Sequence, residues 1–330
     1  MYKYAIIGFG GLGKLLLTNL INLEHERRDF HLQAICGADP KTFTQNVKIN
    51  IGDIDMSSMD FSECNFYKDY KELIDTEELD FIISTLPTYL HEEVAVYALN
   101  KGINVFSEKP MALTVESCDR MIAAAKANNK KLMIGHCLRF NPAFAKLKEY
   151  VENETFGKPY RAEFMRYSQK PHWTWNNWIL DSKLSGGAVL DLHIHDVDLI
   201  NWIFGEPNSI HSAITEKKVE RESIFTQYYY DDLLVLSSAD WSFPKTFEFE
   251  SRCIVNFEKA TIVIDNEKFI GYQDDIVFKP DVMEENDYEL EMRAMLEYFL
   301  DNIPCQQTSP ESVRDSVRLA LKEVEAARKV

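Results

Sequence analysis

The chain has 330 residues, of which 45% are hydrophobic, and it carries a formal net charge of −17. This length is sufficient for two domains, each with its own core. The acidic balance argues against a nucleic-acid or anionic-membrane partner, because both of those surfaces are negative and attract clusters of Lys and Arg.

Targeting and cysteine signals are absent from the sequence. No apolar run approaches the roughly 20 residues that span a bilayer, and no basic region or cleavage site precedes the first strand-like segment. The six cysteines are scattered without a C-x-x-C pair, so we expect reduced thiols and no structural metal. These features predict a soluble cytoplasmic protein.

The chain opens with a strand-like run, Tyr4–Ile7, that leads directly into Gly8-x-Gly10-x-x-Gly13 and then into an apolar helical stripe. Gly8 permits a tight turn, Gly10 lets the backbone approach a pyrophosphate, and Gly13 lets the helix pack close to the sheet. The alternative is a tight turn without a ligand. We predict a dinucleotide site, with cofactor contacts from Gly8, Gly10, Gly11, Leu12 and Gly13.

Short apolar runs alternate with helical patterns through the first 135 residues. This rhythm is typical of βαβ units and predicts a Rossmann domain with a doubly wound parallel sheet over residues 1–136. The predicted strands are Tyr4–Ile7, Leu32–Ala38, Phe81–Thr85, Asn104–Phe106 and Leu132–Ile134. The predicted helices include Val94–Asn100 and, behind Thr114 as N-cap, Val115–Ala127.

Asp39 follows the second predicted strand, where a Rossmann domain presents an acid to the adenosine ribose. A carboxylate there binds the ribose 2′-hydroxyl and repels a 2′-phosphate, so NAD is favoured. Lys41 could instead accept a phosphate, which keeps NADP possible. The alternative for Asp39-Pro40 is a simple turn.

Two loops follow neighbouring strands of the predicted sheet, and ligands of such sheets lie beyond the carboxyl ends of the strands. The first loop supplies Thr85, Leu86 and Pro87, and the second supplies Glu108, Lys109 and Pro110. Pro110 restrains the residue before it and holds Lys109 at the sheet edge. The alternative is that Lys109 is an ordinary solvated lysine.

Beyond residue 137 long strand-like runs dominate, with connections too short for crossover helices. They predict an α+β domain over residues 137–330 with a large, mostly antiparallel open sheet, followed by helices at Tyr288–Leu300 and after Pro310. The predicted strands are Arg161–Gln169, Phe225–Tyr230, Leu233–Trp241, Thr246–Phe257 and Thr261–Asp265. Some are apolar on both faces, so a second subunit in a homodimer or homotetramer, or a helix of the same chain, is expected to cover the second face.

Within this second domain, Gly186-Gly187 precedes a helical segment that contains Asp191 and His195 at positions i and i+4. These two side chains project from one face, with Asp198 near the same stripe and His193 pointing away. A metal site and an ordinary satisfied pair are the alternatives. Without an H-E-x-x-H motif or a Cys/His cluster, we interpret the pair as a base with a neighbouring acid.

A loop before the double glycine is rich in aromatic and amide side chains, which suit a polyhydroxylated ring. Its members are His172, Trp173, Trp175, Asn176, Asn177, Trp178 and Asp181. We expect substrate contacts from Trp173 and Trp178 in particular. The alternative is that the tryptophans anchor the loop into the core.

Taken together, these residues resemble the glucose-fructose oxidoreductase, inositol dehydrogenase and MocA (Gfo/Idh/MocA) family over essentially the whole chain. The resemblance rests on Gly8-x-Gly10-x-x-Gly13, Pro87-x-x-x-His91, Glu108-Lys109-Pro110, Arg139-Phe140-Asn141-Pro142, Gly186-Gly187 and Asp191-x-x-x-His195-Asp196-x-Asp198. It implies hydride transfer between a secondary alcohol of a sugar, polyol or related small molecule and C4 of a nicotinamide.

By the same resemblance, Lys109 would bond the reacting hydroxyl, Asp191 would help to position it, and His195 would take its proton. His91 and Glu108 would join the cofactor site, and Arg139 and Asn141 the substrate site. The resemblance leaves two alternatives open, a non-catalytic NAD(P)-sensing regulatory protein and an NAD-dependent glycoside hydrolase.

Overall fold

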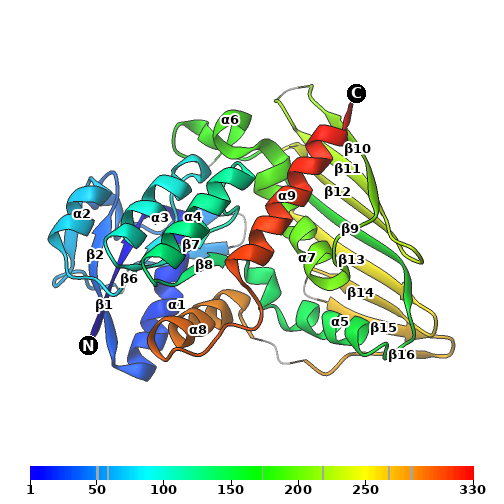
Figure 1. Cartoon of the computed structure of the whole chain (residues 1–330), viewed down its shortest axis with the longest axis horizontal. Helices are drawn as coiled ribbons and strands as arrows, with labels where there is room; N and C mark the ends of the chain where they lie inside the picture. The colour runs from blue at the N-terminus through cyan, green and yellow to red at the C-terminus, as the bar shows by residue number, and fades with distance from the viewer. Residues whose placement is uncertain (50–51, 58, 173, 218, 267, 283–284) are drawn as a thin grey trace. The chain divides into compact units, whose positions relative to one another are not determined.

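The computed structural model describes residues 1–330 with the exception of 50–51, 58, 173, 218, 267 and 283–284. The chain forms two compact units (Figure 1). The first unit is Met1–Cys137 with Asn286–Arg314, and the second is Leu138–Glu285 with Asp315–Val330. The segment Asn286–Arg314, predicted as part of the second domain, clusters with the first unit in the structure.

The first unit is built on a six-stranded parallel sheet with the order β5-β2-β1-β6-β7-β8. Its strands are β1 (Tyr2–Ile7), β2 (Phe30–Cys36), β5 (Asn65–Tyr67), β6 (Phe81–Ser84), β7 (Asn104–Glu108) and β8 (Leu132–Gly135). Residues Tyr4–Ile7 and Phe81–Ser84 are all buried. Burial of the strands on both faces is expected of a parallel sheet between helices, and the predicted Rossmann fold is confirmed.

The remaining elements of the first unit are mostly helices that follow the strands. They are α1 (Gly11–Arg27), α2 (Tyr70–Thr76), α3 (His91–Asn100), α4 (Val115–Ala127) and α8 (Asp287–Leu300), with a small hairpin of β3 (Val47–Ile49) and β4 (Gly52–Ile54). Helix α4 has the predicted bounds, and the Thr114 hydroxyl accepts a hydrogen bond from the Ser117 amide at 3.1 Å as its N-cap.

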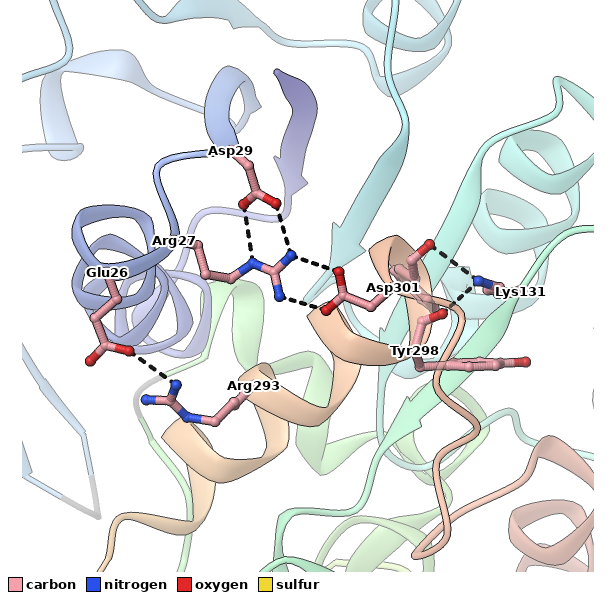
Figure 2. A network of polar contacts seen from close by, with 8 residues as sticks. Glu26, Arg27, Asp29, Lys131, Arg293, Tyr298 and Asp301 are labelled. Carbon is pink, nitrogen blue, oxygen red and sulfur yellow. Dashed lines mark hydrogen bonds and ion pairs between the residues drawn. The ribbon is translucent and has the colours of Figure 1, made fainter.

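Polar contacts tie α8 to the first unit (Figure 2). Arg27, in the last turn of α1, pairs with Asp29 at 2.8 Å and with Asp301, the residue after α8, at 2.7 Å. Lys131, just before β8, donates to the carbonyl oxygen of Tyr298 at 2.5 Å. The Arg27–Asp301 and Lys131–Tyr298 contacts join residues more than 160 positions apart, so no local pattern in the sequence predicts them.

The second unit is built on a nine-stranded sheet with the order β16-β15-β14-β13-β9-β12-β11-β10-β17. Its strands are β9 (Pro159–Gln169), β10 (Ser209–Thr215), β11 (Ser223–Tyr229), β12 (Leu234–Phe243), β13 (Glu250–Phe257), β14 (Thr261–Asp265), β15 (Lys268–Gln273), β16 (Ile276–Phe278) and β17 (Arg328–Lys329). The pairs β9–β12 and β10–β17 are parallel and the other neighbours are antiparallel, which confirms the predicted mostly antiparallel sheet.

Helices α5, α7 and α9 lie over one face of this sheet (Figure 1). The helical segments of the second unit are η3 (Cys137–Arg139), α5 (Pro142–Glu152), η4 (Trp175–Leu180), α6 (Ser182–Ser185), η5 (Val189–His193), α7 (Ile194–Phe204) and α9 (Pro310–Ala326), the first and last of which begin in the first unit. On the opposite face Phe225 is 44% exposed and Leu234 is 37% exposed. A helix of the same chain therefore does not cover these two side chains, and the predicted partner subunit stays a prediction.

Two buried ion pairs fasten α7 inside the second unit. Arg166 of β9 donates to both carboxylate oxygens of Asp196 at 2.8 and 3.1 Å, and Arg139 donates to both oxygens of Asp198 at 2.7 and 2.8 Å. All four side chains are almost fully buried. Two-pronged arginine–carboxylate pairs have a defined geometry, so they fix the rotation of α7 about its axis as well as its position.

Replacing Arg166 with Met is expected to lower the free energy of unfolding by about 3–5 kcal/mol, because it leaves the Asp196 carboxylate buried without its cation. Arg161→Met on the same strand is the matched control, since the Arg161–Glu163 pair is 40% and 41% exposed and such a pair contributes about 0–1 kcal/mol. Urea unfolding of both variants measures the difference. Equal, small losses would contradict a structural role for the buried pair.

Candidate active site

The glycine turn between β1 and α1 is a point of close backbone approach. Gly8 has φ +97°, and a Cβ added there would lie 2.8 Å from the carbonyl carbon of Thr85. A Cβ on Gly13 would lie 2.6 Å from the carbonyl oxygen of Gly8. The Thr85 hydroxyl donates to that same oxygen, which joins the turn to the loop after β6. Residues larger than glycine cannot occupy positions 8 and 13 without moving the backbone.

Gly10 differs from its two neighbours in the motif. A Cβ added at Gly10 would meet no atom within 4 Å, and the residue has φ −87°. No side chain caps α1, and its first turn contains no acidic residue. Gly11 and Leu12, at the start of α1, are half-buried, so the first residues of the helix border the open space beside Gly10. This cradle fits a pyrophosphate, because helix amides and the positive end of the helix dipole attract anions.

Asp39 lies beyond the end of β2 and is exposed. Its Oδ1 accepts a hydrogen bond from the amide of Lys41 at 3.0 Å, so the carboxylate caps the short helix η1 (Pro40–Thr42). Lys14, which sequence reasoning missed, holds the same loop: its buried ammonium donates to the carbonyl oxygens of Thr42 and Gln45, both at 2.7 Å. Burial lowers the pKa of Lys14. Its signal in the sequence is a lysine directly after Gly13 in a helix that packs on the sheet.

His91, at the start of α3, joins the two loops at the carboxyl ends of β6 and β7. Its Nδ1 lies 2.8 Å from the carbonyl oxygen of Pro110, and its Nε2 lies 2.8 Å from that of Leu86. Burial lowers the pKa of His91 below its usual range, while the two carbonyls favour the protonated ring. The imidazole thus links the backbone at Leu86, just before Pro87, to the backbone at Pro110, just after Lys109.

Lys109 is the accessible residue at the end of β7. The residues from Val105 to Ala112 are all buried except Lys109, which is half-buried. The neighbouring Glu108 is buried, and its Oε2 accepts a hydrogen bond from the amide of Lys109 at 3.2 Å. Burial raises the pKa of Glu108 to about 7. Burial also raises the pKa of Glu291 of α8, and repulsion by Glu108 raises it further.

In the second unit, the double glycine shapes the entry into the segment that carries Asp191 and His195. Gly186 and Gly187 have φ +82° and +72°, and a Cβ on Gly187 would lie 2.7 Å from the Cβ of Arg221. The chain then forms η5, a π-helical turn, before it continues as α7. π-Helical turns are rare and occur frequently at functional sites.

Asp191 and His195 stand out from their surroundings by exposure. From Ser185 to Ile200, all of which the structure describes, every residue is buried except these two, which are half-buried. This exposure is consistent with the prediction that they share one face, which stays a prediction. Asp198, predicted near the same stripe, is instead buried against Arg139, because its carboxylate belongs to the ion pair that fixes α7.

Arg139 and Asn141, predicted to contact substrate, each have a structural partner. The Arg139 guanidinium binds Asp198 and lies 5.9 Å from the ring of Trp202. The Asn141 side chain accepts a hydrogen bond from the amide of Ala143 at 3.0 Å and caps α5. These contacts explain both residue types, and the substrate role of the two positions stays a prediction.

The aromatic loop is partly open. Trp173 lies outside the described residues. Trp175 is 69% exposed and Trp178 is half-buried, while Ile179 anchors the loop in the core. Asn176 and Asn177 both have φ +51°, a left-handed conformation that Asn tolerates better than other non-glycine residues. Trp175 is therefore not a core anchor, and Trp178 remains a candidate substrate contact.

Among the described residues, no group of three or more His, Cys, Asp or Glu side chains is arranged to hold a metal ion. No helix in the described part of the chain is long and apolar enough to cross a membrane.

Two family models match the chain, one in each half. Residues 2–136 match the model described as oxidoreductase family, NAD-binding Rossmann fold, and residues 144–263 match the GFO/IDH/MocA C-terminal domain. Similar curated proteins include the myo-inositol 2-dehydrogenase of Thermotoga maritima, 37% identical over 42% of this chain and 40% of the relative. The 2,7-anhydro-N-acetylneuraminate hydratase of Mediterraneibacter gnavus is 28% identical over 43% of this chain and 38% of the relative. The matched part thus spans about two fifths of these relatives.

Solved structures align with this chain over nearly its whole length. An oxidoreductase from Thermotoga maritima aligns with a TM-score of 0.83 at 20% identity, covering 98% of this chain and 96% of that one. The UDP-N-acetylglucosamine 3-dehydrogenase of Acidithiobacillus ferrooxidans aligns with a TM-score of 0.78 at 19% identity, covering 98% and 97%. At these identities the structures establish the fold. With both family models matched in order along the chain, the protein belongs to the Gfo/Idh/MocA family of oxidoreductases with an NAD-binding Rossmann fold.

Proposed function

We propose that the protein is an NAD(P)-dependent dehydrogenase or reductase that acts on a secondary alcohol of a sugar, a polyol or a related small molecule. The observation that carries the proposal is the selective exposure of three polar side chains. Lys109 in the first unit, and Asp191 and His195 in the second, are half-buried within segments that are otherwise buried. Reactive groups need access to substrate, and polar groups that stay accessible inside an otherwise buried segment are candidates for that role.

The nicotinamide cofactor fits the first unit through the open space at Gly10 and the uncapped start of α1. Gly8, Gly10, Gly11, Leu12 and Gly13 would hold its pyrophosphate, and Asp39 its adenosine ribose. Asp39 favours NAD, because its exposed carboxylate would bind a ribose hydroxyl and repel a 2′-phosphate. The residues proposed for the nicotinamide side are Thr85, Leu86, Pro87, His91, Glu108 and Lys109. Of these, His91 would act on the two loops and not on the cofactor itself, since both of its ring nitrogens face backbone carbonyls.

When bound, the cofactor supplies C4 of the nicotinamide as hydride acceptor or donor. In alcohol oxidation, His195 would take the hydroxyl proton as the C–H hydride leaves, so that a neutral carbonyl forms. The Lys109 ammonium would donate a hydrogen bond to the reacting oxygen and stabilise the negative charge that develops there. Asp191, at one helical turn from His195, would orient the hydroxyl or the imidazole.

A ring with several hydroxyl groups is the substrate class that the second unit suits best. The half-buried Trp178 offers an apolar face, and Asn176 and Asn177 on the same loop offer amide donors and acceptors. Two similar proteins named as inositol and UDP-N-acetylglucosamine dehydrogenases support this choice. Trp173, Arg139 and Asn141 remain proposed contributors to the same subsite.

One observation favours a second function. A relative at 28% identity is named a hydratase, a reaction with no net change in oxidation state. Incubation with NAD⁺ and a panel of polyols, free sugars and glycosides, starting with myo-inositol, distinguishes the possibilities. Net NADH formation supports the dehydrogenase. Product formation without net NADH supports transient use of the cofactor, as in a hydratase or glycoside hydrolase, and NADH binding without any turnover supports a regulatory sensor.

Gly10→Ala is expected to weaken NADH binding at least tenfold, roughly, with little loss of stability, because a methyl group fits the chain at this position but enters the space proposed for the pyrophosphate. Titration of nicotinamide fluorescence with NADH and NADPH measures the affinity, and wild type is expected to prefer NADH. Gly13→Ala is the matched control and should instead destabilise the fold, since its methyl group would meet the Gly8 carbonyl. Undiminished NADH affinity in Gly10→Ala would argue for a different cofactor position.

Glu108→Gln is expected to change how stability depends on pH. The folded-state pKa of Glu108 is raised from 4.5 to about 7, so between these values the unfolded chain releases a proton that the folded chain retains. The free energy of unfolding of the wild type therefore falls as the pH rises through this window, by roughly 3 kcal/mol, because one pKa unit corresponds to about 1.4 kcal/mol.

The measurement is the difference in Tm between Glu108→Gln and wild type from pH 5 to pH 8, which should grow with pH in favour of the variant. The same comparison with Glu63→Gln, at an exposed position of the first unit, should give a constant difference. A constant difference for Glu108→Gln as well would mean that this carboxyl group titrates normally.

His195→Ala is expected to lower kcat by at least about 10²-fold with NADH affinity unchanged, because general-base assistance contributes about 10²–10⁴-fold. Steady-state kinetics on the best substrate of the panel, together with the NADH titration, test this. Turnover close to that of wild type would exclude His195 as the base.

A further inference from the structure

Glu323 of α9 is a fully buried carboxylate that accepts hydrogen bonds from three side chains of the second unit. Tyr228 of β11 donates to its Oε1 at 2.6 Å, Thr226 of the same strand donates to its Oε2 at 3.0 Å, and Nε2 of His193 lies 2.9 Å from Oε2. The side chains of Glu323, His193 and Tyr228 are 0% exposed. Three donors around one carboxylate satisfy a buried charge in the manner that low-dielectric surroundings require.

Nε2 is the nitrogen of His193 that faces this network, 2.9 Å from Oε2 of Glu323 and 3.3 Å from the Tyr228 hydroxyl. The Tyr228 hydroxyl has a single hydrogen, which it donates to Glu323. Opposite an ionised carboxylate, Nε2 is then the donor to Oε2. The Nδ1 atom of His193 has no hydrogen-bond partner among the described residues. The ring therefore depends on Glu323 for its orientation.

His193 lies at the junction between η5 and α7. It is the last residue of the π-helical turn η5 and the residue from which α7 begins, two positions after Asp191 and two before His195. The i→i+5 bonding of a π turn is rarer than the i→i+4 bonding of an α-helix, so the turn persists only where its surroundings impose it. Beyond His193, the Arg166 and Arg139 pairs hold α7. His193 supplies the polar side-chain contact between the π turn and α9.

We propose that Glu323 is a positioning residue for the active site, which holds η5 in its π-helical form through His193 and so presents Asp191 and His195 on one accessible stripe. The identity of Asp191 and His195 as reactive residues rests on the proposed function, but the anchoring of the turn does not. In this arrangement α9, which is distant in sequence from the motif, contributes to catalysis without touching substrate.

The test uses Glu323→Gln, which keeps the size of the side chain but replaces one acceptor oxygen with an NH₂ group. With one acceptor oxygen, the variant side chain cannot accept from Tyr228, Thr226 and His193 together. An NH₂ group that faces Nε2 of His193 requires the other tautomer, which places the ring hydrogen on the buried Nδ1 that has no partner. Glu325→Gln is the matched control, because Glu325 lies on the same helix and is exposed.

The primary readout needs no substrate. In full-length protein labelled with ¹³C at the histidine Cε1, the His195 signal is assigned by its loss in His195→Ala and is titrated with pH. We expect Glu323→Gln to change the chemical shift and the titration midpoint of His195, and Glu325→Gln to leave both as in wild type. An unchanged His195 titration in folded Glu323→Gln would overturn the proposal, since a purely structural contact affects Tm without changing the environment of His195.

Tyr228→Phe is the second variant should Glu323→Gln fail to fold, because it removes one donor and leaves both the carboxylate and His193 in place. It is expected to move the His195 signal in the same direction by a smaller amount, and no movement would count against the network. Where a substrate is found, Glu323→Gln should lower kcat by about tenfold or more with NADH affinity unchanged, since small misplacements of catalytic groups cost up to about 10²-fold.

The kinetic and spectroscopic results separate the two hypotheses. Normal turnover in His195→Ala would refute the proposed base and leave the NMR result on η5 intact. A large loss in His195→Ala together with an unaffected His195 signal and normal turnover in Glu323→Gln would retain the proposed function and reject the positioning role.

Discussion

The free energy cost of burying a charged group without a partner is the constraint on which the functional segments of this protein depend. Lys14 cannot lie in the core of the first unit unless its ammonium finds acceptors, and the carbonyls of Thr42 and Gln45 supply them. The loop that carries Asp39 is thereby fixed to α1. In the second unit, Asp196, Asp198 and Glu323 impose the same requirement on Arg166, Arg139 and His193. These buried contacts thus help to fix the segments that carry the accessible residues Asp39, Asp191 and His195.

This constraint divides the motif after the double glycine into two sets of residues. Asp191 and His195 are accessible, whereas His193, Asp196 and Asp198 are buried and paired. All five are residue types that could act as ligands, acids or bases. The buried set contacts α9 through His193, β9 through Asp196 and η3 through Asp198, whereas Asp191 and His195 stay half-buried. The anchoring set keeps the accessible set rigid, which catalysis requires of groups that must meet a reacting atom.

The same fold serves proteins with different names, among them dehydrogenases and a hydratase. This chain shares with the family an NAD-binding Rossmann fold and the C-terminal domain that carries Asp191 and His195. The loop with Trp175, Asn176 and Asn177 is exposed and contributes few residues to the core. Because it is free of core-packing constraints, it can vary without disturbing the fold, and substrate choice within the family is expected to reside there.

The sequence by itself determined the parallel sheet of the first unit, the glycine turn and the bounds of α4. Each of these depends on local periodicity or on the conformational freedom of particular residues, which a sequence displays directly. Only the tertiary structure decided the parallel pairing of β9 with β12, the attachment of α8 to the first unit through Arg27 and Asp301, and the partners of Lys14, Asp198 and His193. These contacts join residues far apart in the chain, and several carboxylates and cations could have formed them equally well on chemical grounds. Which of them meet depends on how the elements pack, because a buried charge selects its partner by position and not by residue type alone.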